Sequence, residues 1–367
     1  MSASVVVVGG GYGGVRVAKA LDEVAEVILV EERDAFVHNV AALRGVVDAG
    51  WAERMFMPYD RLLRRGRVVR GRAQRVEPGG VTLASGEHIA ADYVVLATGS
   101  GYPFPAKAEV SEAAGALERL GEARAALQAA SSVLLLGAGP VGLEFAGEIK
   151  AVWPDKRVVL VEAGERILDG EVPEELRAEV ARQLAELGVQ VILGAQVDRE
   201  LLPGGPGQAK SFTAALSSGA EVSADIWFQC FGAAPSTDCL GEQLAGARRA
   251  DGLVEVQDTL QVVGQERVFA LGDITALAEL KKAKSAELHA DVVVANIRAL
   301  IEGGALTSYR PGGLIMALSL GPGGGAGYTP ATGLLGARAV AGFKSGDLHT
   351  GPYEELLGVK EPAEQSA

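Results

Sequence analysis

Cysteine and long apolar runs are both scarce in this sequence, and each scarcity excludes a class of protein. The 367 residues include only two cysteines, Cys230 and Cys239, so the chain cannot build a disulfide framework, and their spacing matches no metal site. We therefore expect a reducing compartment, the cytoplasm, and structural roles for both thiols. No apolar run reaches the roughly 20 residues that cross a bilayer. The N-terminus predicts no signal region, because a strand pattern begins at Val5, and no N-myristoylation, because Ser2 replaces the required glycine.

Basic residues are also in deficit. Lys and Arg number 34 against 47 Asp and Glu, which gives a formal net charge of -13. An acidic surface repels phosphate backbones, so we expect no nucleic acid partner. Apolar residues make up 48% of the chain, as in folded soluble proteins, and the length of 367 residues predicts two or three domains. Glycine is abundant, with 49 residues, which indicates tight turns or backbone that approaches a ligand closely.

Short apolar runs alternate with amphipathic segments, which is the pattern of a parallel sheet with helices over both faces. VVVVGGGYGG at residues 5–14 is repeated in kind as VLLLGAGPVG at residues 133–142. Each copy is followed by a predicted helix and a second strand, which ends in Glu31 in the first copy and in Glu162 in the second. The repetition predicts an α/β protein with two nested Rossmann-like dinucleotide-binding domains.

Each copy contains the spacing GxGxxG between a strand and a helix. The first glycine permits a tight turn, the second lets a pyrophosphate reach the backbone, and the third allows the helix to pack closely on the strand. The phosphates would lie at the helix N-terminus, and the acid about twenty residues later would accept hydrogen bonds from ribose hydroxyls. The predicted cofactor residues are Gly9, Gly11, Gly14 and Glu31 in the first copy and Gly137, Gly139, Gly142 and Glu162 in the second.

Two further motifs assign a cofactor to each copy. LATG at residues 96–99 supplies Thr98 and Gly99, and LGD at residues 271–273 supplies Asp273 late in the chain. This order matches flavoproteins in which a second nucleotide domain is inserted into the first, and there the late Asp binds the ribityl or pyrophosphate part of the flavin. We therefore expect FAD at the first glycine motif and a nicotinamide cofactor at the second. The expected domains are residues 1–104 with 235–310 for FAD, 105–234 for NAD(P)H, and 311–367 as a short α+β C-terminal subdomain with a glycine-rich hairpin.

Glu162 bears on the choice of nicotinamide cofactor. A carboxylate at the ribose 2′-hydroxyl repels a 2′-phosphate, so Glu162 favours NADH over NADPH. Arg166 lies four residues further on and weakens this inference, because a nearby Arg accommodates a 2′-phosphate. NADPH therefore stays open as an alternative donor.

Four longer strings resemble the apoptosis-inducing-factor-like flavoprotein family. They are HNVAALR at residues 38–44, EFAGEIK at 144–150, HADVVVANI at 289–297 and KSGDL at 344–348, in the order that the family has. The similarity covers nearly the whole chain, and the nearest branch is that of the ferroptosis suppressors, which are relatives of type II NADH dehydrogenases. The resemblance implies an FAD-dependent NAD(P)H:quinone oxidoreductase that acts on ubiquinone or a related lipid quinone at a membrane surface.

Three residues depart from the family pattern. Ser2 lacks the myristoylation signal that the branch often carries, and Glu162 stands where the animal members have a neutral or basic residue, which strengthens the expectation of NADH. His349 occupies a position after KSGDL where an aromatic residue near the flavin is usual. The last departure argues against close packing of the C-terminus on the flavin.

The positions of the cysteines exclude a thiol relay. Disulfide reductases of this architecture carry a cysteine pair soon after the first glycine motif, and residues 37–46 contain no cysteine. Sulfide:quinone reductases also use cysteines near the flavin, and Cys230 and Cys239 fall in the wrong part of the pattern. We therefore expect the flavin itself to pass electrons to the acceptor.

Charge identifies the candidate catalytic residues. Hydride transfer to a flavin leaves an anionic ring, which nearby positive potential stabilises. Lys281, with Lys282 and Lys284 beside it, comes before or at the start of the helix that follows Asp273, and a solvated basic turn is the alternative for these lysines. Lys344 in KSGDL is a second candidate, on the quinone side.

Four more residues are expected near the cofactors. Glu144 and Glu148 lie one helical turn apart and share a face of the helix after the second glycine motif, so either could approach the nicotinamide. Asn39 and Arg44 are expected to border the flavin. No histidine has a spacing that assigns it a proton-transfer role.

Contact with a membrane surface and a homodimer stay open as interactions, beside the small-molecule quinone. The candidate membrane face, for which packing against the flavin domain is the alternative, consists of Leu334, Leu335, Arg338, Val340, Phe343 and Lys344. Two other functions also stay open. One is a redox-sensing interaction protein like apoptosis-inducing factor, in which a slow NADH charge-transfer complex changes dimerisation, and the other is a reductase for a small electron-carrier protein.

Overall fold

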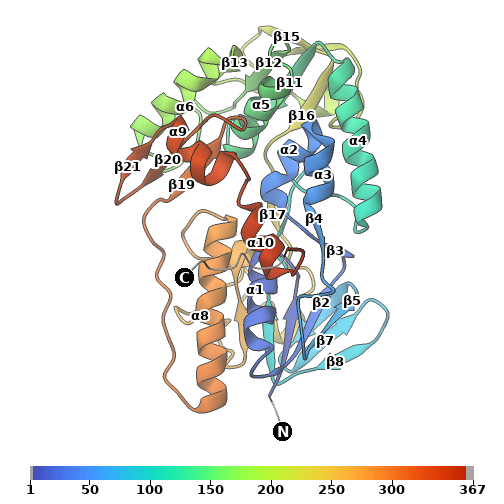
Figure 1. Ribbon diagram of the computed structural model, residues 1–367, viewed down its shortest axis with the longest axis vertical. Coiled ribbons are helices and arrows are strands. Elements are labelled where there is room, and N and C mark those ends of the chain that lie inside the picture. Colours follow the sequence, from blue (N-terminus) through green and yellow to red (C-terminus); the bar gives the residue numbers. More distant parts are fainter. Residues whose placement is uncertain (1–2, 361–367) are drawn as a thin grey trace.

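A five-stranded parallel sheet organises the lower part of the molecule (Figure 1). The computed structural model describes residues 3–360, so Ser2 lies outside the described residues. The strands are short buried runs of Val, Ile and Leu, as expected for a parallel sheet covered on both faces. In spatial order they are β18 (Val268–Ala270), β9 (Tyr93–Leu96), β1 (Ser4–Val8), β2 (Glu26–Glu31) and β5 (Arg67–Arg70).

Different elements cover the two faces of this sheet. On one face, Val5 and Val7 pack against the helices α1 (Tyr12–Leu21) and α8 (Ala283–Glu302). On the other, Val6 and Val8 pack against a three-stranded antiparallel sheet, β6 (Ala73–Glu77), β7 (Gly80–Leu83) and β8 (His88–Ala90), and against α7 (Glu242–Ala245). The expectation of helices over both faces was therefore wrong here, because the apolar side of an antiparallel sheet buries a valine run equally well.

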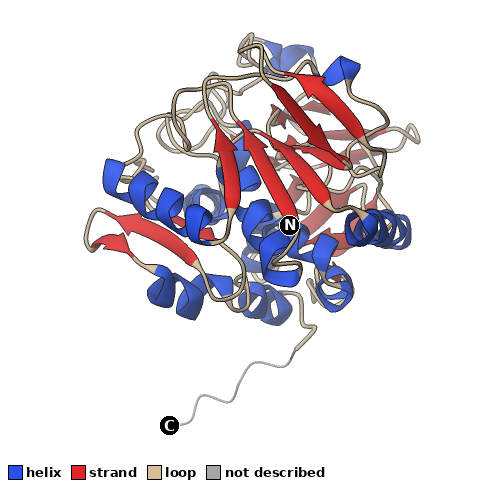
Figure 2. Ribbon diagram, turned by 90° about the horizontal axis from the view of Figure 1, so that it is seen from above, coloured by secondary structure: helices blue, strands red, loops and turns tan. Residues whose placement is uncertain are grey.

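A second parallel sheet repeats this arrangement in the upper part (Figure 1). Helices again cover one face, and a β-hairpin covers the other. Seen from above, the strands run through the middle of the molecule with helices around them (Figure 2). The sheet consists of β13 (Val189–Ile192), β12 (Arg157–Val161), β11 (Ser132–Leu136) and β16 (Ile226–Gln229), with α4 (Ala113–Ala129), α5 (Pro140–Val152), α6 (Glu174–Glu186), and the hairpin β14 (Phe212–Ala215) and β15 (Glu221–Ala224).

The second fold is nested within the first. The chain leaves the first sheet through β10 (Ser100–Gly101) and returns through β17 (Ala234–Pro235), and these two strands pair antiparallel. After the return, β18 joins the first sheet beside β9. The order of elements supports the domain division expected from the sequence, and its bounds stay a proposal.

The C-terminal residues contact both nucleotide-binding folds. The predicted hairpin is confirmed, because β19 (Met316–Ser319) pairs antiparallel with β20 (Gly325–Thr329). This small sheet packs on α5 and α6, while Tyr353 lies with its ring centroid 5.0 Å from that of Tyr12 on α1. Residues 361–367 of the expected subdomain lie outside the described residues. The other strands and α-helices, with one π-helical turn, are β21 (Gly333–Leu335), α9 (Ala337–Val340), the π-helical turn (Ala341–Ser345), α10 (Thr350–Leu356), and, nearer the N-terminus, β3 (Ala35–Val37), β4 (Phe56–Pro58), α2 (Ala42–Val47) and α3 (Ala49–Arg54).

Candidate functional site

The two glycine turns are built alike. Gly9 has φ +105° and Gly137 has φ +103°, a conformation that side chains rarely adopt. A Cβ at Gly14 would overlap the carbonyl oxygen of Gly9, and a Cβ at Gly142 would overlap that of Gly137. In both copies, therefore, only glycine lets the helix start this close to the preceding strand.

Each turn is held by the acid that follows it at the end of the next strand. The backbone N–H of Gly10 donates to Oε2 of Glu31 (2.5 Å), and the N–H of Ala138 donates to Oε2 of Glu162 (2.6 Å). The second oxygens accept backbone N–H groups of Arg33 and Gly164, both at 2.9 Å. Both carboxylates thus lie beside the glycine turn, where a ribose of a bound dinucleotide is expected.

The residues at both helix starts fit a pyrophosphate. Neither α1 nor α5 has a side-chain cap or an acidic residue in its first turn, so the positive end of each helix dipole is not neutralised. A Cβ built on Gly11 or Gly139 meets no atom within 4 Å, which leaves the backbone open to a ligand. Together these features make two anion sites of the kind that dinucleotides occupy.

A central cavity of ≈390 Å³ lies where the two folds meet. Its wall includes the first glycine turn, together with Asn39, Thr98, Gly99 and Asp273 from the predicted FAD residues. It also includes Glu144 of α5 and Lys344 of the C-terminal segment. An adjoining cavity of ≈690 Å³ shares seven wall residues with it, so the two form one continuous groove. The shared residues are Gly9, Glu31, Arg33, Thr98, Ser100, Tyr102 and Lys107.

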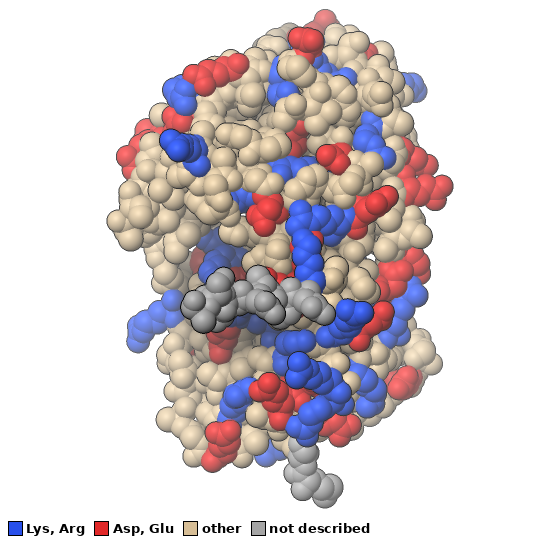
Figure 3. Space-filling view, in the orientation of Figure 1, with Lys and Arg blue, Asp and Glu red and all other residues tan. Residues whose placement is uncertain are grey.

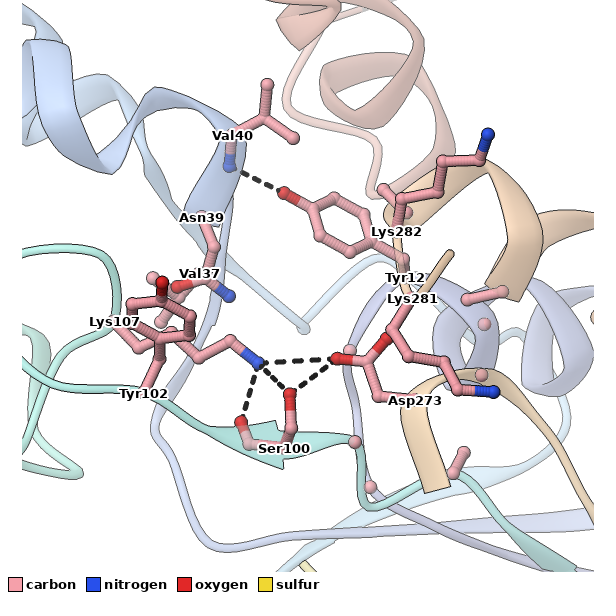
Figure 4. Close-up of a pocket in the computed structure, with 18 of the residues that line it drawn as sticks. Tyr12, Val37, Asn39, Val40, Ser100, Tyr102, Lys107, Asp273, Lys281 and Lys282 are labelled. Carbon is pink, nitrogen blue, oxygen red and sulfur yellow. Dashed lines mark hydrogen bonds and ion pairs between the residues drawn. The ribbon is translucent and has the colours of Figure 1, made fainter. Parts of the chain in front are cut away.

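Lys107 joins Asp273 in the groove (Figure 4). Its Nζ donates to the carbonyl oxygen of Ser100 (2.5 Å) and to the hydroxyl oxygen (2.9 Å), and lies 3.7 Å from Oδ2 of Asp273. The Ser100 hydroxyl donates to the same carboxylate oxygen (2.5 Å). Lys107 and Ser100 were not among the site residues expected from the sequence. The one available signal was a single lysine close to the expected domain boundary between residues 104 and 105, and nothing in the sequence connects it with Asp273.

A buried histidine fixes the turn that carries Asp273. Nδ1 of His289 accepts the backbone N–H of Gly272 (3.0 Å), so Nε2 carries the proton and donates to Glu279 (2.6 Å). The other Glu279 oxygen accepts the Tyr309 hydroxyl (2.8 Å). Burial lowers the pKa of His289, with Glu279 opposing this, so the neutral form fits its position.

The structure brings two predicted catalytic residues together from positions 200 residues apart. Nζ of Lys344 lies 2.6 Å from Oε1 of Glu144 and donates to the carbonyl oxygen of Ala317 (2.6 Å). The same Glu144 oxygen accepts the backbone N–H of Ser319 (3.0 Å). This ion pair fixes a cation and a carboxylate in the wall of the central cavity.

The other predicted lysine is oriented differently. Lys281 lines the central cavity, but its Nζ donates to the carbonyl oxygens of Thr275 (2.7 Å) and Leu277 (2.9 Å). In Figure 4 its amine points away from Ser100 and Lys107. Lys282 donates to the carbonyl oxygen of Ile315. Lys107, rather than Lys281, thus directs its ammonium group into the groove.

Arg44 lies outside both cavity walls. It forms a buried bidentate ion pair with Glu148 on α5, with N–O distances of 2.9 and 2.7 Å, and donates to the carbonyl oxygen of Gly346 (3.2 Å). The side chains of Arg44 and Glu148 are 3% and 4% exposed. These two residues therefore join α2 to α5 behind the site.

Neither cysteine reaches the central cavity. Cys230 is buried and Cys239 lines only the adjoining cavity. Burial raises the pKa of the Cys230 thiol to about 12, as expected for an inert, structural cysteine. Within residues 3–360, no His, Cys, Asp and Glu side chains gather in a metal-binding group. Nor does any helix in this range combine the length and hydropathy needed to cross a bilayer.

The candidate membrane face is only partly present. Leu334 and Phe343 are exposed, and so is Arg338. Val340, however, is fully buried, and Lys344 is paired with Glu144. Of the two alternatives that the sequence left open, inward packing applies to Val340 and Lys344, because α9 and the π-helical turn direct these two side chains inward.

The sequence of the chain matches known proteins over its full length. A family model described as pyridine nucleotide-disulphide oxidoreductase matches residues 3–290. Ferroptosis suppressor protein 1 of Taeniopygia guttata is 34% identical over 99% of this chain and 98% of its own. Apoptosis-inducing factor homolog B of Dictyostelium discoideum is 29% identical over 98% and 97%.

Solved structures share the fold at lower identity. The sulfide:quinone oxidoreductase from Aquifex aeolicus has a TM-score of 0.75 and 20% identity, over 97% of this chain and 92% of that one. NDH2 from Plasmodium falciparum in complex with NADH has a TM-score of 0.71 and 13% identity, over 94% and 93%. The chain belongs to the pyridine nucleotide-disulphide oxidoreductase family, as an FAD- and NAD(P)H-dependent oxidoreductase of the group that contains ferroptosis suppressor protein 1 and the apoptosis-inducing factor homologues.

Proposed function

We propose that this protein is an NAD(P)H:quinone oxidoreductase that reduces a ubiquinone-like lipid quinone without a cysteine relay. One observation carries the proposal. The central cavity is lined both by the first glycine turn and by Glu144 of α5, the helix that begins at the second glycine turn. Two dinucleotides bound at the two helix starts would therefore extend toward the same space.

FAD is assigned to the groove formed by the two cavities. Residues Gly9–Gly14 with Glu31 would hold its pyrophosphate and adenosine ribose, and Asp273, Ser100 and Lys107 would hold its polar chain. FAD, when bound, accepts hydride from the nicotinamide and releases electrons to the quinone. The residues of the groove would orient the FAD. No thiol would take part in the electron transfer, since both cysteines of the chain lie outside the wall of the central cavity.

NADH is assigned to the second glycine turn. Glu162 lies where it would accept the 2′-hydroxyl and repel a 2′-phosphate. Arg166 is exposed four residues further on, so NADPH stays a slower alternative in this proposal. Glu144 would meet the nicotinamide end, and Lys344, held by Glu144 and the Ala317 carbonyl, would keep a positive charge in the cavity wall.

Steady-state oxidation of NADH and NADPH against a panel of quinones tests the proposal. We expect rapid turnover with NADH and a ubiquinone analogue, and a kcat/KM for NADPH at least about tenfold lower, the value of a single charge contact. Comparable efficiency with NADPH would refute the role of Glu162. Persistent long-wavelength absorbance without quinone turnover would instead identify a redox-sensing protein, and acceleration only by a ferredoxin-like protein would identify a carrier reductase.

A further inference from the structure

An unusually basic segment lies on this acidic protein. Residues 61–70, RLLRRGRVVR, contain five arginines and no acid. Since the whole chain carries -13, the rest of it carries -18. Arg61, Arg64, Arg65, Arg67 and Arg70 are all exposed. Figure 3 shows basic side chains beside acidic ones in the lower half of the face that it draws. We call this segment the arginine turn.

The backbone of the arginine turn is fixed from inside the protein. The buried carboxylate of Asp22 accepts the backbone N–H groups of Arg64 (2.6 Å), Arg65 (3.1 Å) and Gly66 (2.6 Å). Any side chain at Gly66 would overlap the Val27 carbonyl oxygen, so the turn lies tightly on β2. The arginine side chains are thus presented outward from a rigid base.

Few of these charges are neutralised locally. Within the described residues, Arg67 approaches Glu26 (3.7 Å) and Arg70 approaches Glu112 (2.7 Å), and both pairs are about half exposed. Arg61, Arg64 and Arg65 have no acidic partner there within 4.0 Å, and Lys19 adds a further cation by donating to the Arg61 carbonyl oxygen. Exposed pairs of this kind leave most of the positive potential available to a partner.

Protection of a sheet edge explains only part of the cluster. β5 is an edge strand of the first sheet, and charged side chains on edge strands prevent edge-to-edge association. Only Arg67 and Arg70 belong to β5, however, and Arg61, Arg64 and Arg65 precede it. Edge protection therefore does not account for these three arginines. Arg61 and Arg65 donate to the backbone carbonyl oxygens of Gly358 (3.3 Å) and Glu23 (2.6 Å), which are contacts that leave the positive charges unneutralised.

We propose that the arginine turn docks this protein on the surface of an anionic lipid membrane. The inference rests on the proposed function, since a lipid quinone has to be drawn from a bilayer. A protein of net charge -13 is repelled by anionic lipid unless one region is strongly basic. The turn supplies that region and would orient the molecule, with each arginine near the headgroups adding to the attraction.

Co-sedimentation with vesicles tests the proposal. Full-length protein is mixed with vesicles of phosphatidylcholine alone or of phosphatidylcholine with phosphatidylglycerol, at low and high salt. We expect binding only to the anionic vesicles, with loss of binding at high salt. The double variant R64E/R65E should weaken the partition at least about tenfold. The control K210E/R310E makes the same change in net charge at two exposed positions elsewhere and should bind as the wild type does.

Several outcomes would overturn the proposal. One is that the wild type stays in the supernatant, and another is that both charge variants bind equally weakly. A third is that binding is lost in L334S/F343S, which removes two exposed apolar side chains of the candidate membrane face, but not in R64E/R65E. Turnover with a water-soluble quinone, measured without vesicles, keeps the two hypotheses apart. Absence of that turnover contradicts the proposed function, whereas normal turnover without sedimentation contradicts the docking alone. Normal turnover and urea unfolding of R64E/R65E would show that its fold is intact.

Discussion

Lys107 is the ammonium group that faces both the central and the adjoining cavity. Burial lowers its pKa, and Asp273 counteracts this, so Lys107 is a desolvated cation beside the chain of the expected FAD. The substitution Lys107→Met should weaken FAD binding about tenfold to a hundredfold, the value of a hydrogen bond to a charged group. Fluorescence titration of the apoprotein with FAD measures this.

Lys281→Met is the matched control for Lys107→Met. The Lys281 ammonium is already bound by two carbonyl groups of its own segment, so its loss should change the dissociation constant of FAD less. A larger effect at Lys281 than at Lys107 would restore the sequence-based expectation and refute the assignment drawn from the structure.

His38 should make the stability of the protein depend on pH. Burial lowers its pKa to about 4, whereas an unfolded histidine titrates near 6.5. Between these values the unfolded chain binds a proton that the folded protein does not. The contribution of His38 to the free energy of unfolding is therefore fully present above about pH 6.5 and is lost as the pH falls. At about pH 5 the loss is about 2 kcal/mol.

Urea unfolding of the wild type and of the variants His38→Gln and His88→Gln, at about pH 6.5 and about pH 5, measures this pH dependence. Glutamine can still donate to the Leu348 carbonyl oxygen that His38 contacts at 2.8 Å, and H38Q should lose this part of the pH dependence. His88 is exposed, so H88Q should behave as the wild type does. An unchanged pH profile in H38Q would show that other groups cause the dependence.

The predictable site residues are those in local motifs. Glycines at fixed spacing, with an acid at the end of the next strand, located both turns because strand, turn and helix are contiguous in the chain. Glu144 and Lys344 were identified separately, as parts of motifs, but not as a pair. The place of Lys107 beside Asp273 was not predictable, because the two residues come from distant segments and no spacing in the sequence encodes their contact. The same holds for His289, which links Glu279 to the backbone of Gly272.

At the scale of elements, α5 offers a sharp comparison between two glycines of one motif. A Cβ at Gly142 would overlap the Gly137 carbonyl oxygen, so Gly142→Ala should destabilise the fold by about 1–3 kcal/mol, as overpacking does. A Cβ at Gly139 meets only open space, so Gly139→Ala should leave stability unchanged and raise the KM for NADH. Urea unfolding without nucleotide and NADH kinetics measure the two effects. Equal destabilisation in both variants would contradict this division of roles.

Periodicity predicted the elements but not all of their neighbours. Apolar runs identified the parallel strands, and the hairpin at residues 316–329 was expected from its glycines. A run that is buried on both faces carries no information on what covers it, so the antiparallel sheet over Val6 and Val8 was not foreseen. The π-helical turn Ala341–Ser345, which turns Lys344 inward, has no sequence signature of its own.

At the scale of the whole molecule, one apolar core crosses the expected domain boundaries. It includes residues of α2 and α3 from the N-terminal 54 residues, the helices over the second sheet, and Leu318, Leu320 and Ala326 of the C-terminal segment. The sequence assigned residues 1–104 to the FAD domain, yet α2 and α3 pack on α4 and α5. The nucleotide-binding folds are therefore joined by a shared core as well as by the two crossing strands.

The ion pair between Arg44 and Glu148 lies within this shared core and should determine how cooperatively the two folds unfold. Burial raises the pKa of Glu148, and Arg44 opposes that shift, so removal of Arg44 leaves a carboxylate that is costly to ionise. Arg44→Met should destabilise the protein by about 3–5 kcal/mol, and the double variant R44M/E148L should recover most of this, because it leaves no buried charge.

Arg182→Met, which breaks an exposed pair on α6, should cost less than about 1 kcal/mol. Urea unfolding followed by tryptophan fluorescence measures all three. A loss of less than about 1 kcal/mol in R44M, or no recovery in the double variant, would show that the apolar contacts alone hold the two folds together.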